Sequence, residues 1–242
     1  MGTTRKVASR QLSVARSYEP IRPRSLFGDR PHRRRGLWVV LLGPDGAGKS
    51  SVIEEIGDGV AAGFNGCVAY HLRPALTGKK RAAKRNCDPH GQKARCVLVT
   101  LGKLVYLLAA NWLGYLAKVR PRVQGGALVM FDRYFPDGLV DPRRYRLPRS
   151  SRWMVTLIDK LVPKPDLYVV LEAPVTVLRE RKTEVTFLEA ERLCRAYHQL
   201  ADNLPNAVTV DASRPLSHVV DEVLECSIVR HLARHGEVFG AA

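Results

Sequence analysis

The chain has 242 residues, and its hydrophobic fraction of 45% is enough for the core of one α/β domain with a tail. Its five cysteines are odd in number, scattered and without a C-x-x-C pair, which argues against a disulfide-stapled secreted protein and favours reduced thiols in a cytoplasmic one. The formal net charge of +16 suits partners that are anionic, such as nucleic acid, a lipid surface or a phosphorylated small molecule.

The basic charge is concentrated at the amino terminus. Residues 1–35 hold ten Lys and Arg against Glu19 and Asp29, a net charge of +8, with few large apolar side chains and no periodicity. We predict a disordered basic arm over 1–35, one domain over 36–235 and a flexible tail over 236–242. Two alternatives for the arm are a mitochondrial transit peptide and a contact with nucleic acid or membrane.

The next stretch predicts a phosphate-binding loop. An apolar run over 37–42 has the pattern of a buried parallel strand, and residues 43–50 read G-x-x-x-x-G-K-[ST] before a helical pattern over 49–62. Glycines let backbone N–H groups converge on one anion, a lysine reaches the β- and γ-phosphates, and a serine hydroxyl can ligate Mg²⁺. The residues expected to bind the nucleotide are Gly43, Pro44, Asp45, Gly46, Ala47, Gly48, Lys49, Ser50 and Ser51.

The following segment alternates between a short strand and a long helix. We predict a strand over 66–72, then Arg73 and a basic loop to about residue 94 that partly covers a ligand. The apolar stretch over 96–118 predicts a helix that lies in the core or in a homodimer interface; its length also leaves membrane contact open.

The remaining elements complete an α/β pattern. We predict strands over 127–132, 166–172 and 207–211, a loop over 134–149, and helices over 151–161, 175–183, 187–203 and 216–234. Five apolar strands alternating with helices predict a parallel, doubly wound sheet of the P-loop NTPase type flanked by helices. Ligands of such sheets bind at the carboxyl ends of the strands, where the phosphate-binding loop falls.

Charged side chains that suit phosphoryl transfer are expected at the same edge. Asp132 ends its strand, where an acid can hold Mg²⁺ or its waters, although a helix-capping acid is the alternative. Arg73 and Arg133 follow two neighbouring strands, and Arg179 and Arg181 lie where a closing lid could bring positive charge to the phosphoryl group. The alternative for each arginine is a solvated surface position.

Several motifs together resemble the thymidylate kinase family of nucleoside monophosphate kinases. The segment 43–51 is similar to that family's P-loop, including the acid at Asp45, and 132–134 is similar to its D-R-[YFH] motif. The stretches 165–174 and 197–223 resemble its fourth strand and its carboxyl-terminal strand and helix. The resemblance covers about residues 36–225.

The resemblance implies that ATP, with Mg²⁺ at Ser50 and Asp132, phosphorylates a nucleoside monophosphate. It assigns catalytic roles to Lys49, Arg133, Arg179 and Arg181. It also implies that Asp45 contacts the acceptor's sugar hydroxyl, that Arg73 and Arg133 hold its phosphate, and that Tyr134 belongs to the acceptor site.

Two acceptor segments depart from the family pattern. Only the Arg and Pro of T-R-E-P-G-G remain, at 73–74, and 135–145 replaces the segment that faces the base. These changes are similar to a divergent thymidylate-kinase-like branch associated with polysaccharide synthesis. The most favoured reaction is phosphorylation of dTMP to dTDP; the alternatives are a kinase of a sugar or glycan precursor and a nucleotide switch whose basic arm binds nucleic acid.

Overall fold

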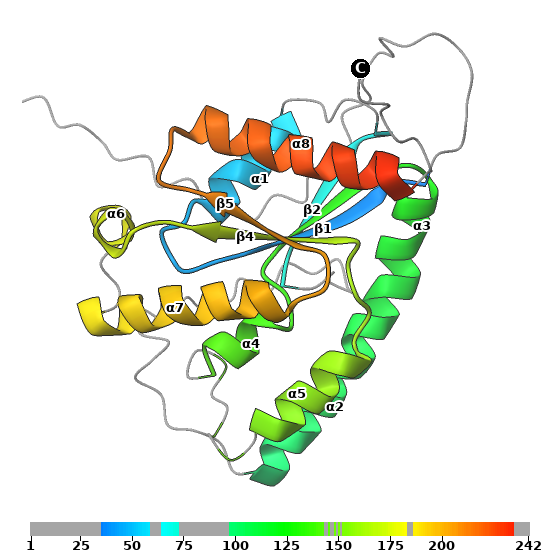
Figure 1. Cartoon of the computed structure of the whole chain (residues 1–242). Helices are drawn as coiled ribbons and strands as arrows, with labels where there is room; N and C mark the ends of the chain where they lie inside the picture. Colours follow the sequence, from blue (N-terminus) through cyan, green and yellow to red (C-terminus); the bar gives the residue numbers. More distant parts are fainter. Residues whose placement is uncertain are drawn as a thin grey trace, which may run out of the picture.

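The computed structural model describes residues 35–58, 64–72, 97–142, 145, 148, 150, 152–182 and 186–234. In this part of the chain, five strands form one parallel sheet in the order β2-β3-β1-β4-β5 (Figure 1). The strands are β1 Leu37–Leu42, β2 Cys67–His71, β3 Leu128–Asp132, β4 Leu167–Glu172 and β5 Ala207–Asp211. The predicted parallel, doubly wound sheet is confirmed. The predicted arm over 1–35 lies outside the described residues except for Arg35. The predicted tail, Arg73 and the basic loop lie wholly outside them.

Helices cover both faces of this sheet. They are α1 Lys49–Asp58, α2 Val97–Gly114, the π-helix η1 Tyr115–Val119, α3 Arg120–Gln124, α4 Asp137–Val140, α5 Arg152–Leu161, α6 Val175–Arg181, α7 Phe187–Asn203 and α8 Leu216–Arg234. In Figure 1, α1 and α8 lie on one face of the sheet, and α7, α4, α5 and α2 lie on the other.

The alternation of side chains along β1 explains the two cores. Leu37, Val39 and Leu41 pack with α1 and α8, whereas Trp38 and Val40 pack with the helices of the opposite face. All six residues of β1 are buried, as expected for a central strand covered on both sides. The strand therefore holds the loop that follows it in a fixed position.

The predicted loop over 134–149 contains a short helix that sequence reasoning missed. Residues Asp137–Val140 form α4, with Pro136 as the N-cap residue. A single turn with Gly138 inside it has too little intrinsic propensity to be recognised, so tertiary contacts with α5 and α7 must stabilise it.

The predicted helix over 96–118 is longer and less regular than expected. It continues through η1, where the N–H of Arg120 donates to the carbonyl of Tyr115, and then through α3 to Gln124. Pro121 lacks the N–H that an uninterrupted α-helix would use, and the wider π turn directly precedes it.

The interpretation of this helix as a buried core element is wrong for much of its surface. Val105, Tyr106 and Leu113 are 53%, 61% and 55% exposed, although Leu104 and Ala110 are buried. By length and composition alone, Val99–Gln124 could cross a membrane, with a mean hydropathy of 1.2 and 28% of its most apolar 18-residue window buried.

Candidate active site

The loop between β1 and α1 has the geometry of a phosphate-binding loop. Gly46 and Gly48 adopt φ angles of 88° and 83°, which L-residues with a side chain rarely adopt. A Cβ on Gly46 would lie 2.8 Å from the carbonyl oxygen of Leu178, so this position also requires a glycine for close approach to α6. The loop is therefore packed closely against α6.

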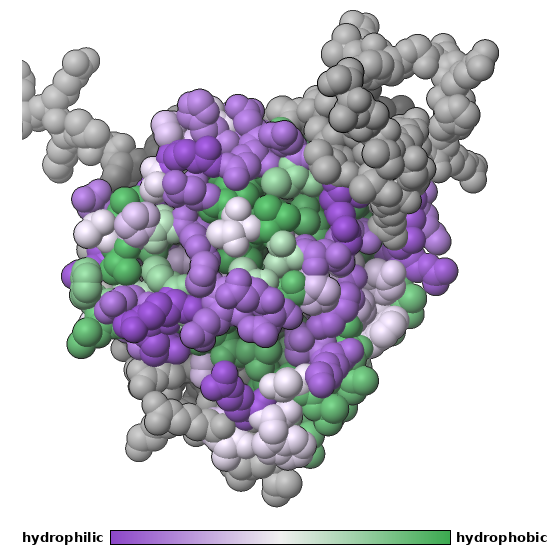
Figure 2. Space-filling model, viewed as in Figure 1, coloured by the Kyte–Doolittle hydropathy of each residue, from purple (hydrophilic) through white to green (hydrophobic). Residues whose placement is uncertain are grey.

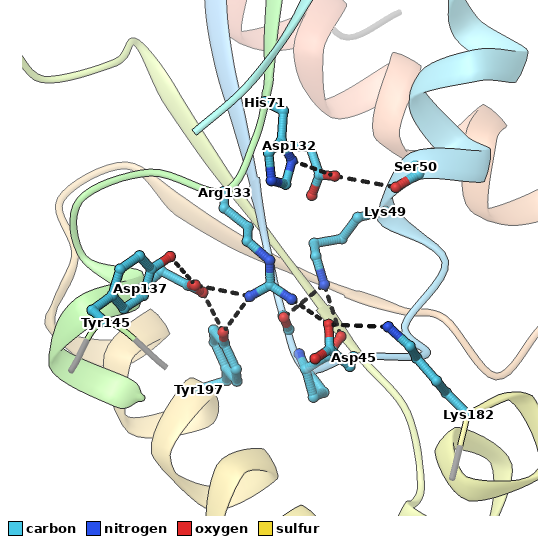
Figure 3. Close-up of polar contacts among 12 residues, drawn as sticks. Asp45, Lys49, Ser50, His71, Asp132, Arg133, Asp137, Tyr145, Lys182 and Tyr197 are labelled. Carbon is cyan, nitrogen blue, oxygen red and sulfur yellow. Dashed lines mark hydrogen bonds and ion pairs between the residues drawn. The ribbon is translucent and has the colours of Figure 1, made fainter. Parts of the chain in front are cut away.

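Lys49 lies folded into this loop. Its ammonium donates to the carbonyl oxygens of Gly43 and Pro44, each at 2.7 Å, and the residue is buried (Figure 3). Burial, followed by the nearby positive charge of Arg133, lowers the pKa of Lys49 to about 7. A phosphate at this position would supply the negative charge that the buried ammonium lacks.

Ser50 and Asp132 meet, as predicted for a Mg²⁺ site. The Ser50 hydroxyl donates to Oδ2 of Asp132 at 3.1 Å, and the other carboxylate oxygen is buried without a hydrogen-bond partner. Nδ1 of His71, from the neighbouring strand, also lies 3.1 Å from Oδ2. Hard oxygen donors with one buried atom unsatisfied fit Mg²⁺. Burial raises the pKa of Asp132, but His71 and the charges of Lys49 and Arg133 lower it below its ordinary value.

Arg133 turns from the end of β3 towards the phosphate-binding loop. Its φ of 71° is unusual for a residue with a side chain, and its N–H donates to the carbonyl of Leu41 at 3.0 Å. The buried guanidinium pairs with Asp45 of the loop through Nη2, and with Asp137 through Nη1 at 2.8 Å. Burial lowers the pKa of Arg133, but Asp137, Tyr197 and Asp45 together raise it well above its ordinary value.

Three residues around Arg133 were not assigned to the site from the sequence. Asp137 accepts hydrogen bonds from Tyr145 at 2.8 Å and from Tyr197, and Tyr197 also accepts one from Arg133 at 3.3 Å (Figure 3). The one feature of the sequence that pointed to these residues was the departure of 135–145 from the family pattern. It marked the segment that carries Asp137 and Tyr145, but Tyr197 lies 64 residues from Arg133 and gave no signal.

The predicted lid arginines lie apart from this network. Arg179 is exposed on α6, and Nη1 of Arg181 donates to the carbonyl of Ala212, after β5, at 2.8 Å. Lys182 is closer to the loop, with Nζ 4.0 Å from Asp45. Tyr134 is buried, and its hydroxyl donates to the carbonyl of Pro163 at 2.7 Å, so its polar group points into the core rather than into the site.

Two cavities lie beside the network. One of about 230 Å³ is lined mainly by apolar side chains, with a few polar ones. Its lining comprises Leu72, Lys103, Leu104, Leu107, Asn111, Tyr134, Phe135, Gly138, Tyr145 and Val155. The other, of about 490 Å³, adjoins Pro44 and the ends of β4 and β5. The site therefore has one cavity beside Tyr145 of the network and another beside the phosphate-binding loop.

No family model matches the chain, but individual proteins do. A thymidylate kinase of Limosilactobacillus reuteri is 27% identical over 213 residues, covering 78% of this chain and 93% of the relative. A thymidylate kinase of Leifsonia xyli is 29% identical over 215 residues, covering 80% and 95%. Both alignments run through most of the described domain.

Solved structures share the fold at lower identity. The thymidylate kinase of Candida albicans superposes with a TM-score of 0.54 and 15% identity, covering 83% of this chain and 94% of that one. The deoxyadenosine kinase of M. mycoides gives a TM-score of 0.50 and 13% identity, covering 78% and 98%. Together with the P-loop and the D-R-Y segment, these comparisons show that the chain is similar in sequence to thymidylate kinases and shares the fold of these P-loop kinases.

Proposed function

We propose that the protein transfers the γ-phosphoryl group of ATP to a nucleoside monophosphate, most favourably dTMP. The observation that carries this proposal is the ion pair between Arg133 and Asp45. It brings a buried cation from the end of β3 next to the phosphate-binding loop. A donor phosphate on Lys49 and an acceptor phosphate on Arg133 would then be neighbours, as phosphoryl transfer requires.

The residues divide the work between donor and acceptor. The backbone N–H groups of the loop and Lys49 bind the donor phosphates, and Ser50 and Asp132 would hold Mg²⁺, which neutralises charge on the phosphate oxygens. Arg133 orients the acceptor phosphate, whose own oxygen is the nucleophile. We assign Arg179 and Arg181 to lid closure over the transferring group, and we assign Arg73 to the acceptor phosphate.

The cavity beside Tyr145 favours a nucleobase over a sugar as the other part of the acceptor. Its volume of about 230 Å³ is below the roughly 300 Å³ of small ligand pockets, so it holds one ring rather than a whole nucleotide. Leu104, Leu107 and Phe135 offer apolar surface to such a ring, whereas a sugar would need hydrogen bonds on most of its edges. Asn111 and Lys103 supply the few polar groups.

A coupled ADP-release assay tests the proposal. It would contain ATP and Mg²⁺ with dTMP, the other nucleoside monophosphates, deoxyadenosine, free sugars or sugar phosphates. We expect turnover with nucleoside monophosphates, fastest with dTMP. Turnover with a sugar alone would move the protein to glycan metabolism, and acceptor-independent hydrolysis that nucleic acid stimulates would favour the nucleotide switch.

The pKa of Lys49 predicts how ATP affinity depends on pH. Bound phosphates raise the pKa of Lys49 above about 7, its value without ATP. At a pH between the pKa values of the free and the ATP-bound protein, Lys49 must take up a proton when ATP binds, so ATP binding weakens as the pH rises. We expect Kd to increase by up to about tenfold per pH unit from 7 to 9. Calorimetry in buffers of different ionisation enthalpy measures both the Kd for ATP and the number of protons taken up on binding. In Lys49→Met the Kd for ATP should no longer depend on pH in this range. A pH dependence that persists would assign the proton to another group.

We further propose that the protein is a cytoplasmic homodimer formed through the exposed face of α2, η1 and α5. Side chains on this face include Tyr106, Trp112, Leu113, Leu116, Trp153 and Leu157. Trp112 Nε1 donates to the carbonyl of Leu161 at 3.0 Å, which joins the two helices into one surface. Green surface at the lower right of Figure 2 lies over this helix pair. Apolar patches of this kind mark interaction surfaces.

A charge on this face should separate the subunits. We expect wild-type protein to sediment at twice the chain mass of 27.0 kDa and Leu113→Glu to sediment as a monomer, because a buried unpaired carboxylate opposes association. Leu188→Glu is the control, since Leu188 is 77% exposed on α7, away from this face. A wild-type monomer at high concentration that co-sediments with lipid vesicles would instead indicate membrane contact.

A further inference from the structure

Asp137 is a buried carboxylate that phosphoryl transfer, as described above, does not use directly. Its side chain is fully buried at the start of α4, and three hydrogen-bond donors from three other parts of the chain converge on it. We propose that Asp137, with Tyr145 and Tyr197, is a positioning residue that fixes the Arg133 guanidinium for the acceptor phosphate. This inference rests on the proposed function for the identity of that phosphate.

The hydrogen bonds leave Asp137 no role as a direct ligand of the substrate. Oδ2 accepts from Arg133 and from Tyr145, each at 2.8 Å, and Oδ1 accepts from Tyr197. A carboxylate with zero exposure and donors on both oxygens has no free surface to offer. Any effect of Asp137 on the acceptor must therefore pass through Arg133.

The two carboxylates that pair with Arg133 differ in whether an incoming phosphate can replace them. Asp137 holds Nη1 from inside the protein, whereas Asp45 holds Nη2 from the edge of the site, with its side chain 16% exposed and Lys182 at 4.0 Å. An incoming phosphate can replace Asp45 at Nη2 while Nη1 stays on Asp137. The guanidinium then keeps its orientation through the exchange, which lowers the entropy cost of binding.

The same network connects Arg133, through Asp137 and Tyr145, to the wall of the cavity of about 230 Å³. The carbonyl of Tyr145 accepts from Nζ of Lys103 on α2 at 2.6 Å, while the Tyr145 hydroxyl donates to Asp137. Lys103 and Tyr145 both line the cavity of about 230 Å³. The position of the phosphate-binding cation and the shape of the cavity therefore depend on one another.

Nitrogen-15 NMR of arginine side chains tests the positioning role without any substrate. In the wild type we expect separate, slowly exchanging Nη–H signals for Arg133, assigned from their loss in Arg133→Lys. In Asp137→Asn these signals should merge, because the amide cannot replace the charged acceptor of Nη1. Asp141→Asn is the matched control, since Asp141 is also buried and lies at the end of the same helix.

Two milder variants test the same role if Asp137→Asn fails to fold. Tyr145→Phe and Tyr197→Phe each remove one donor from the carboxylate and should broaden the Arg133 signals partially. Arg133 signals that stay resolved in a folded Asp137→Asn, or in both tyrosine variants, would overturn the proposal.

Kinetics with dTMP then separate positioning from general stability. In Asp137→Asn we expect the KM for dTMP to rise about 10- to 100-fold while the KM for ATP stays unchanged, and in an Arg133→Lys background the same change should have little further effect. Equal changes in both KM values would contradict the inference. A wild type that turns over no acceptor would overturn the proposed function instead, and the NMR result would still decide whether Asp137 positions Arg133.

Discussion

Replacing Lys49 by Ala is expected to lower kcat about 10²- to 10³-fold, the cost of removing one preorganised donor to a developing charge. The structure supports a large effect because the ammonium is buried within the phosphate-binding loop, where its charge is poorly screened. Steady-state ADP release at saturating ATP and acceptor measures it. Because the hydrogen bonds of Lys49 within the described part of the chain go to the backbone carbonyls of Gly43 and Pro44, the variant should fold normally.

Lys160→Ala is the matched control, since this lysine is exposed on α5. It should retain wild-type turnover. If Lys49→Ala kept ATP-dependent phosphorylation of the acceptor at the wild-type rate, the assignment of the loop as the donor site would be wrong.

Arg133→Ala is expected to lose both activity and stability. Removal of the guanidinium leaves Asp137 as a fully buried carboxylate without its cation, which costs about 3–5 kcal/mol of unfolding free energy. It also removes the proposed ligand of the acceptor phosphate, so kcat/KM for the acceptor should fall by about 10²-fold or more. Urea unfolding and acceptor kinetics measure the two effects separately.

The double variant distinguishes an unpaired charge from lost packing. Arg133→Ala with Asp137→Asn should be more stable than Arg133→Ala alone, because the second change removes the uncompensated carboxylate. Arg195→Ala, on the exposed face of α7, should leave both measurements unchanged. A double variant less stable than either single one would show that packing, not charge, dominates.

The features that the sequence predicted well depend on local physics. An apolar strand, glycines at left-handed positions and a helix start define the phosphate-binding loop within 14 residues, 37–50. Parallel pairing of β1 with β3 then requires Asp132 to end beside that loop, so its contact with Ser50 was predictable from topology. Neither inference needed knowledge of distant side chains.

The surroundings of Arg133 could not be predicted in the same way. The orientation of Arg133 depends on a positive φ and on Tyr197, which α7 brings in through tertiary packing. The exposure of α2 was equally hidden, because a helix that is apolar on all sides has the same pattern in a core, at an interface or in a membrane.

The π-helix η1 has a consequence for how the chain tolerates changes in length. Lys103, Leu107 and Asn111 form the cavity wall upstream of this turn, and Val123 fixes the helix to the sheet downstream of it. Each residue of an α-helix advances the side chains by about 100°. The wider π turn accommodates one residue more than regular α geometry needs, so deleting one residue from 115–119 would restore an α-helix and leave the phase between the cavity wall and the sheet nearly unchanged. A deletion from 112–114, between the cavity wall and the π turn, would instead rotate the wall by about 100° relative to the sheet, so it should be more damaging than a deletion within the π turn.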